Sequence, residues 1–282
     1  MRMTNIYYFS GTGNSLYVAR ELCKRIPNCT LQPIVKLLKQ HDLVAESDIV
    51  GLVFPIYINS TPIPVREFIK KIQLKPNQFI FVVATHCGYP GKVELYLEKL
   101  LKKKNKTLDA YYKLKMMGNT PKGLVPSFMV AQDWSKKITK KAILSLDEKV
   151  QKELDYMAKA ITEKEKNTGE NNPDRPNVLL RFANRLLQVP MQWNAERTNA
   201  QIGFYADSTC TGCGLCAQVC PSYKVKMEQN KPVWQKEVRC YYCYACFNFC
   251  PEQAILIKDY THKEGRYIHP GIEAQDIADQ KE

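Results

Sequence analysis

Eight cysteines near the C-terminal end of the sequence repeat one spacing, C-x2-C-x2-C-x3-C-P. They are Cys210, Cys213, Cys216 and Cys220, followed by Pro221, and Cys240, Cys243, Cys246 and Cys250, followed by Pro251. This spacing is typical of thiolate ligands to cubane iron–sulfur clusters, in which the fourth cysteine of one motif points toward the neighbouring cluster. Such clusters carry single electrons. The doubled motif therefore predicts two [4Fe-4S] clusters and a role in electron transfer.

Zinc binding and disulfide bonds are the other uses of so many cysteines. Structural zinc sites usually combine two C-x2-C pairs that are separated by a longer loop. In each of the two motifs here, by contrast, three evenly spaced cysteines are followed closely by a fourth. Residues 1–9 lack the apolar stretch and cleavage site of a secretory signal peptide. We therefore expect a cytoplasmic protein with reduced cysteines, in which Cys23 and Cys29 pack as small apolar residues.

A second pattern with binding chemistry lies at the start of the chain. Residues 3–9 are apolar and β-prone, and apolar residues at helical spacing begin at Leu16. The loop between them consists of Ser10, Gly11, Thr12, Gly13, Asn14 and Ser15. Hydroxyl and backbone N–H groups at a helix N-terminus bind anions. Because the loop has no lysine and lacks the third glycine of the dinucleotide fingerprint, it predicts a monophosphate site, with an ordinary capped turn as the other interpretation.

The residues that follow alternate between strand and helix patterns, as in a doubly wound parallel sheet. We expect strands over 48–57, 79–85 and 107–117, and helices over 64–72, 92–104 and 144–166. Ligands of such sheets bind beyond the carboxyl ends of the strands. Loops 10–15, 55–59 and 85–91 should therefore meet at one site.

These three loops suit a flavin. Besides the phosphate loop, the candidate flavin-binding residues are Pro55, Ile56, Tyr57, Thr85, His86, Cys87, Gly88 and Tyr89. Tyr57 could stack on the isoalloxazine, and the turn from Cys87 to Tyr89 could bring backbone groups to the ring edge. Either tyrosine could instead be a packing residue. A cysteine beside a flavin could also be a reactive thiol.

Residues 205–260 resemble a bacterial two-[4Fe-4S] ferredoxin, on the strength of the doubled cysteine motif. In that family, three cysteines of one motif and the last of the other hold each cluster. The resemblance implies two crossed ligand sets, which are Cys210, Cys213, Cys216 with Cys250, and Cys240, Cys243, Cys246 with Cys220. The crossing would also tie the two halves of the module together.

Residues 3–166 resemble the flavodoxin-like family, which binds FMN noncovalently with its phosphate in a Ser/Thr-x-Thr-Gly-x-Thr loop. Here the last hydroxyl belongs to Ser15, which keeps the donor. As a whole the chain is similar to the fused flavodoxin–ferredoxin proteins of anaerobic bacteria and archaea, whose C-terminal tails resemble residues 266–270. The resemblance implies an α/β flavodoxin-like doubly wound parallel sheet, a small α+β two-[4Fe-4S] ferredoxin domain, and FMN as the flavin.

Four regions follow from these patterns. We expect a flavodoxin-like FMN-binding domain over 1–168, a linker and packing helix over 169–204, the ferredoxin domain over 205–260, and a C-terminal tail over 261–282. The linker is predicted from the polar stretch 167–177, which contains two prolines, and the packing helix from the apolar stripe over 178–193.

The charge is uneven along the chain. Residues 1–204 account for the whole excess of positive charge, because residues 205–282 have 9 Lys and Arg against 10 Asp and Glu and the formal net charge of the chain is +13; lysine-rich runs lie at 99–106 and 136–141. Such runs are usually solvated faces, but they could steer an acidic redox partner protein. Nucleic acid is disfavoured as a partner because no recognition motif accompanies the basic runs. The sequence has no transmembrane run of eighteen apolar residues, and it leaves a homodimer open.

The leading functional hypothesis is an iron–sulfur flavoprotein that relays single electrons between two [4Fe-4S] clusters and FMN and on to redox partners. One alternative is an FMN-dependent reductase of a quinone or another small organic acceptor, fed by ferredoxin. Another is a redox sensor. No catalytic side chain is predicted, and the absence of a dinucleotide fingerprint disfavours direct use of NADH.

Overall fold

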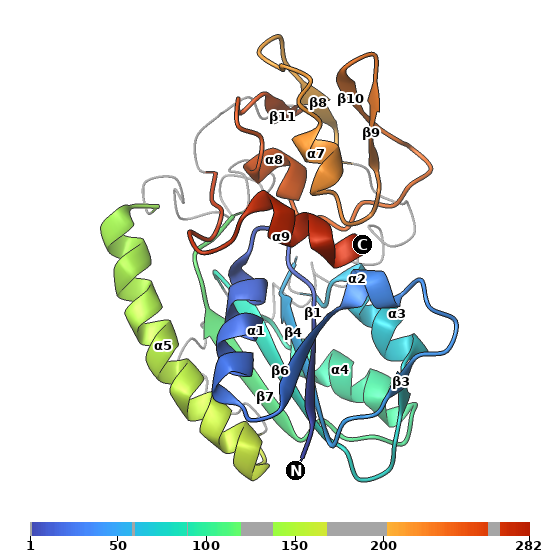
Figure 1. Ribbon diagram of the computed structural model, residues 1–282, viewed down its shortest axis with the longest axis vertical. Coiled ribbons are helices and arrows are strands. Elements are labelled where there is room, and N and C mark those ends of the chain that lie inside the picture. Colours follow the sequence, from blue (N-terminus) through green and yellow to red (C-terminus); the bar gives the residue numbers. More distant parts are fainter. Residues whose placement is uncertain (1, 58–59, 89, 120–137, 168–201, 259–265) are drawn as a thin grey trace, which may run out of the picture.

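The computed structural model describes residues 2–57, 60–88, 90–119, 138–167, 202–258 and 266–282. The part described consists of a parallel-sheet module, a smaller module that contains both cysteine motifs, and a C-terminal segment between them (Figure 1). The predicted packing helix at 178–193 and most of the predicted linker lie outside the described residues.

Five parallel strands form the central sheet of the larger module. They are β1 (Thr4–Tyr8), β2 (Cys29–Pro33), β4 (Ile49–Pro55), β6 (Phe79–His86) and β7 (Ala110–Lys115). Their order in the sheet is β2-β1-β4-β6-β7, and every neighbouring pair is parallel. This is the strand order of the flavodoxin-like doubly wound fold, which confirms the predicted fold class. All eight residues of β6 are buried, as expected of a central parallel strand.

Helices cover both faces of this sheet (Figure 1). The helices are α1 (Asn14–Arg25), α2 (Ile34–Leu37), α3 (Ile63–Lys71), α4 (Val93–Lys102) and α5 (Lys140–Glu163). Helices α1 and α5 pack together on one face, and α3 and α4 on the other. A short parallel pair, β3 (Val44–Ala45) and β5 (Gln73–Leu74), lies outside the main sheet.

The helices at 64–72 and 92–104 and the strands at 48–57, 79–85 and 107–117 are confirmed within a few residues at each end. Helix α5 begins four residues before the predicted start at 144, because the Thr139 hydroxyl caps its N-terminus by accepting a hydrogen bond from the Ala142 N–H at 3.2 Å. None of the helices in the described part of the chain is both long enough and apolar enough to cross a membrane.

The smaller module lies above the carboxyl ends of the parallel strands (Figure 1). Its elements are β8 (Phe204–Ala206), α7 (Leu215–Gln218), β9 (Val225–Glu228), β10 (Lys231–Trp234), α8 (Ala245–Asn248) and β11 (Ile255–Ile257). Strands β9 and β10 form an antiparallel hairpin, and β11 closes the module by pairing antiparallel with β8. Each cysteine motif contributes one short helix, α7 or α8, so the sequence repeat is also a structural repeat.

The C-terminal segment 266–282 contains α9 (Ala274–Ala278) and a 3-10 turn, η2 (Asp279–Lys281). It crosses between the two modules, with α9 directly beneath the cysteine-rich one (Figure 1). We refer to residues 266–282 as the strap.

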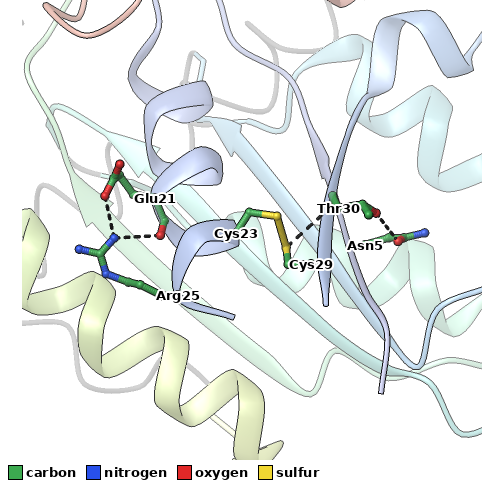
Figure 2. The surroundings of a disulfide bond; sticks show 6 residues. All are labelled: Asn5, Glu21, Cys23, Arg25, Cys29 and Thr30. Carbon is green, nitrogen blue, oxygen red and sulfur yellow. Dashed lines mark hydrogen bonds and ion pairs between the residues drawn. A yellow bond between two sulfur atoms is a disulfide. The ribbon is translucent and has the colours of Figure 1, made fainter. Parts of the chain in front are cut away.

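Cys23 and Cys29 differ from the expectation that they pack as free thiols. A disulfide bond joins them, from the last turns of α1 to the first residue of β2 (Figure 2). The reason is topological, because only a three-residue connection separates α1 from β2, and it leaves the two Cα atoms 5.2 Å apart. That separation lies within the usual range for disulfides.

Candidate functional site

The first cysteine motif and the last cysteine of the second motif line one pocket in the smaller module. Its walls include Cys210, Cys213, Cys216 and Cys250. Cys213 is exposed, whereas Cys216 is buried. Burial raises the pKa of Cys216 to about 11, against a lowering effect of a backbone hydrogen bond at Ala217 and with a smaller contribution from the other three thiols. These four cysteines therefore line the same pocket.

Two turns of the first motif have glycine in the left-handed backbone conformation. Gly212 and Gly214 have φ angles of 76° and 79°, in the left-handed region. A Cβ at Gly212 would also lie 2.5 Å from the carbonyl oxygen of Asn230 in the β9–β10 turn. The second motif has Tyr242 and Tyr244 at the equivalent left-handed positions, with φ angles of 58° and 55°. Both motifs thus use the same turn geometry, although only the first uses glycine for it.

The remaining four cysteines form a second, more deeply buried group. Burial raises the pKa of Cys243 and Cys246 well above the usual range, and the next cause in both residues is Cys220 of the first motif. Burial raises the pKa of Cys240 to about 11, although a hydrogen bond from the Tyr242 N–H lowers it. The nearby Cys220 raises the pKa of Cys240 further. Thiols this basic become thiolates only when a cation compensates for burial. The donor set thus fits a group that carries positively charged iron.

No three Cys, His, Asp or Glu side chains among the described residues converge as they would around a single metal ion. Thiolates around one zinc ion must all lie about 2.3 Å from a common centre. A cubane presents four separate iron atoms, so its thiolates stand farther apart.

Aromatic and cationic side chains surround the buried group. Phe204 stacks on Trp234 at 5.7 Å and meets Tyr244 edge-on at 6.2 Å. Lys224, only 1% exposed, donates to the carbonyl oxygens of Gln235 and Val238 at 2.6 and 2.7 Å.

A second buried lysine comes from the strap. Lys281 Nζ donates to the carbonyls of Ala217 at 3.0 Å and Cys220 at 3.4 Å. Apolar cover and positive charge close to ligand sulfurs are the means by which proteins tune cluster potentials.

The predicted phosphate loop lies at the N-terminus of α1 and is tied to the neighbouring loops. Ser10 Oγ accepts a hydrogen bond from the Gly13 N–H at 3.2 Å, and Ser15 Oγ shares one with Thr85 Oγ1 at 2.8 Å. Thr12 Oγ1 accepts one from Asn119 Nδ2 at 2.6 Å. Loop 10–15 and the end of β6 are therefore in contact, as the sheet topology predicted.

Gly11 marks the place where this loop meets the other parts of the molecule. A Cβ on Gly11 would lie 2.5 Å from Tyr57 Oη and 2.6 Å from the carbonyl oxygen of Cys243. Phe9 meets Tyr57 edge-on at 6.2 Å and Tyr241 edge-on at 6.1 Å. The second cysteine motif therefore lies directly against the predicted phosphate loop and Tyr57.

Several buried polar atoms near these loops have no hydrogen-bond partner among the described residues. They include Asn14 Oδ1, Tyr57 Oη and Thr61 Oγ1. Burial raises the pKa of Tyr57 well above its usual value, so its hydroxyl remains a donor at neutral pH. Unpartnered buried polar groups are costly in a native protein, and a bound ligand or water that supplies the missing partner is one explanation for them. Together with the helix N-terminus, they fit a phosphate-bearing flavin by the chemistry of their donors and acceptors.

The third predicted loop is only partly described. Pro55 ends β4, and the Ile56 N–H donates to the Thr85 carbonyl at 2.8 Å, so the second and third loops adjoin. His86 Nδ1 lies 2.6 Å from the carbonyl oxygen of Gly88. Burial raises the pKa of Cys87, which leaves its thiol protonated at neutral pH rather than reactive.

Gly88 is exposed, and a Cβ there would meet nothing within 4 Å. Tyr89 lies outside the described residues. The structure therefore brings the other predicted loop residues to one edge of the sheet without testing Tyr89.

The strap contacts both modules, which the sequence patterns did not predict. The His269 N–H donates to the Thr12 carbonyl at 2.9 Å, and Gln280 hydrogen-bonds to Ser10. On its other side Arg266 lies over the Phe247 ring at 3.8 Å and donates to the Ile255 carbonyl at 2.7 Å. The strap thus fastens the phosphate loop to the cysteine-rich module.

Comparison with known proteins identifies the cysteine-rich module. Residues 191–255 match the family described as 4Fe-4S dicluster domain. A ferredoxin of Methanothermococcus thermolithotrophicus is 35% identical over 52 residues, which are 18% of this chain and 87% of that protein.

Solved structures similar to the chain include two flavoproteins of low sequence identity. An FMN-dependent NADH-azoreductase from Bacillus anthracis, in complex with FMN, is 10% identical with a TM-score of 0.38, covering 57% of this chain and 99% of that one. The two-electron reduced flavodoxin of Megasphaera elsdenii is 14% identical with a TM-score of 0.28, covering 39% of this chain and 85% of that one. The fold assignment rests on the strand order given above.

Proposed function

Because the chain belongs, through its C-terminal module, to the ferredoxin family with a 4Fe-4S dicluster domain, we propose that it is an electron-transfer iron–sulfur flavoprotein. In this proposal it exchanges single electrons with redox partner proteins by means of two [4Fe-4S] clusters and one FMN. The main support for the proposal is the position of Gly11, which lies between Tyr57 of the predicted flavin loops and Cys243 of the second motif.

Two crossed sets of cysteines would hold the clusters. Cys210, Cys213, Cys216 and Cys250 would form the outer site, and Cys220, Cys240, Cys243 and Cys246 the inner site, next to the flavin loops. The exposed Cys213 makes the outer site the one that a partner protein can approach. The buried Cys243 and Cys246 keep water away from the inner site.

Loop 10–15 and its neighbours would hold FMN, which supplies one- and two-electron chemistry when bound. The Ser10, Thr12 and Ser15 hydroxyls and the N-terminus of α1 would bind the phosphate, in exchange for their present internal hydrogen bonds. Tyr57 and the described part of loop 85–91 would contact the ring. The strap would exclude water from the phosphate loop.

An acidic redox partner remains part of the proposal, but the structure limits how the lysine run at 99–106 could serve it. Lys99 and Lys102 lie in the last turn of α4, and Lys106 Nζ donates to the carbonyl of Lys75, just before β6. Helix α4 runs back from the carboxyl ends of the strands, so this run lies at the opposite edge of the sheet from the cysteine motifs. Its charge would raise encounter rates without marking the docking site.

The described residues include no feature beside the predicted flavin loops that favours the alternative of a reductase for a small organic acceptor. The described residues include no feature that favours the redox sensor. Cytoplasmic location, a homodimer and the four domain boundaries remain proposals.

Metal, sulfide and flavin analysis of anaerobically purified protein tests the proposed function. We expect about eight iron, eight sulfide and one FMN per chain. Reduced ferredoxin should bleach the visible spectrum of both centres, whereas NADH alone should not. Zinc in place of iron, or cluster-loaded protein that never retains flavin, would contradict the proposal.

A further inference from the structure

A cavity of about 310 Å³ lies between α1, α5, the end of β7 and the strap, on the α5 side of the phosphate loop. It is separate from the predicted flavin-ring loops, and none of the eight motif cysteines lines it. Its walls are mainly apolar, from Met116, Ile143, Leu144 and Val150. An engineered apolar cavity of roughly 150 Å³ binds benzene. The cavity here has about twice that volume, which is enough for two fused rings.

Three polar side chains meet in this mainly apolar cavity. The Tyr17 hydroxyl donates to Asp147 Oδ1 at 2.7 Å, and the Tyr17 ring stacks on His269 with 3.9 Å between ring centroids. All three residues line the cavity. A mainly apolar pocket with a few convergent polar groups is the usual form of a small-molecule site.

The hydrogen bonds define what these groups can offer to a ligand. His269 Nδ1 accepts from the Gly271 N–H at 3.2 Å, so a neutral imidazole carries its proton on Nε2. Burial lowers the pKa of His269 to about 4, which keeps the ring neutral at physiological pH. The site therefore offers one N–H donor from His269 and a carboxylate acceptor from Asp147, within an aromatic wall.

We propose that this cavity binds a one- or two-ring aromatic compound that carries a hydroxyl group. The hydroxyl would donate to the Asp147 carboxylate and accept from His269 Nε2, while the rings pack between Tyr17 and the apolar residues of α5. This inference goes beyond the proposed electron transfer, and it concerns binding alone. The backbone N–H of His269 donates to the carbonyl of Thr12 in the phosphate loop. An occupant would therefore contact a strap residue that is hydrogen-bonded to that loop.

Calorimetric titration of the anaerobically purified full-length holoprotein tests the proposal, with 2-naphthol as the probe and naphthalene as the matched compound without a hydroxyl. We expect saturable binding of 2-naphthol, at least tenfold tighter than any binding of naphthalene. Asp147→Asn should weaken the binding of 2-naphthol about tenfold, because it removes the charged acceptor.

Two matched tryptophan variants locate the bound probe. Leu144 and Leu95 are both exposed helical leucines, at 56% and 52%, but only Leu144 lines the cavity. Leu144→Trp should therefore weaken binding at least tenfold, and Leu95→Trp should leave it unchanged. The proposal is overturned if 2-naphthol does not bind saturably, if naphthalene binds equally well, or if the two tryptophan variants behave alike. Because no electron transfer is measured, none of these results depends on the proposed function.

Discussion

Gln280 and Ser10 exchange two hydrogen bonds across almost the whole length of the chain. The Ser10 N–H donates to Gln280 Oε1 at 2.8 Å, and Gln280 Nε2 donates back to the Ser10 carbonyl at 3.0 Å. Gln280 is fully buried. This pair fixes the strap to the first residue of the phosphate loop, so the C-terminus is part of the site.

Replacing Gln280 with alanine should destabilise the protein by about 1–3 kcal/mol, because it leaves the Ser10 N–H and carbonyl buried without partners. Urea unfolding of anaerobically purified protein measures this. The control is Gln275→Ala, which removes another strap glutamine whose hydrogen bonds to Gln218 and Asp279 are exposed. The Gln275→Ala substitution should lower the free energy of unfolding by less than about 0.5 kcal/mol. Equal costs for the two variants would show that the strap does not hold the loop.

Gly11→Ala should destabilise the contact between the two modules. The new methyl group would lie within 2.6 Å of both Tyr57 Oη and the Cys243 carbonyl, so backbone must move at a cost of about 1–3 kcal/mol. Gly88→Ala is the matched control, because its methyl group meets nothing within 4 Å. Thermal unfolding should therefore separate the two variants. A Gly11→Ala protein as stable as Gly88→Ala would contradict the close approach.

Lys281→Met should lower the reduction potential of the proposed inner cluster, because it removes a buried positive charge beside Cys220. Potentiometric titration followed by electron paramagnetic resonance measures the potential. The comparison is Lys231→Met, whose exposed ammonium group donates to the Cys210 carbonyl at 3.0 Å in the outer motif. Water screens that charge, so its removal should shift the outer potential less. A larger shift in Lys231→Met would refute the assignment of inner and outer sites.

His269 predicts a pH dependence of stability. Its pKa falls from 6.5 in the unfolded chain to about 4 in the folded protein, so acid protonates the unfolded state first. The stabilisation is complete above pH 6.5 and is lost as the pH falls toward 4. His269→Phe keeps an aromatic ring against Tyr17 but cannot titrate. Between pH 7.5 and 5.5, the free energy of unfolding should therefore fall by about 1 kcal/mol more in the wild type than in the variant. Parallel profiles would argue against a buried neutral imidazole.

The Cys23–Cys29 disulfide closes a short loop, with a sequence separation of six. Chain-entropy arguments give such a bond about 2 kcal/mol of stabilisation. Dithiothreitol should therefore lower the free energy of unfolding of the wild type by that amount and leave Cys23→Ser unchanged. Thiol counting by mass spectrometry after alkylation would verify that the bond is present before reduction. If the wild type is equally stable in both conditions, the bond has no structural role.

Motif spacing predicted the chemistry of this chain because ligand geometry is local. Cys210, Cys213 and Cys216 sit one short turn apart whatever surrounds them, and loop 10–15 joins a strand to a helix through contacts between near neighbours. Strand and helix periodicity predicted most of the sheet for the same reason. The disulfide between Cys23 and Cys29 was missed because it depends on how α1 and β2 meet.

The sequence by itself predicted iron–sulfur and flavin chemistry, the fold class of each module and the loops that gather at the carboxyl edge of the sheet. Only the tertiary structure decided that Cys243 lies against Gly11, that the strap closes the phosphate loop, and that the lysine run at 99–106 lies at the far edge. Periodicity and spacing describe neighbours along the chain. Contacts between residues as far apart as Ser10 and Gln280 depend on the packing of whole modules, which no local pattern encodes.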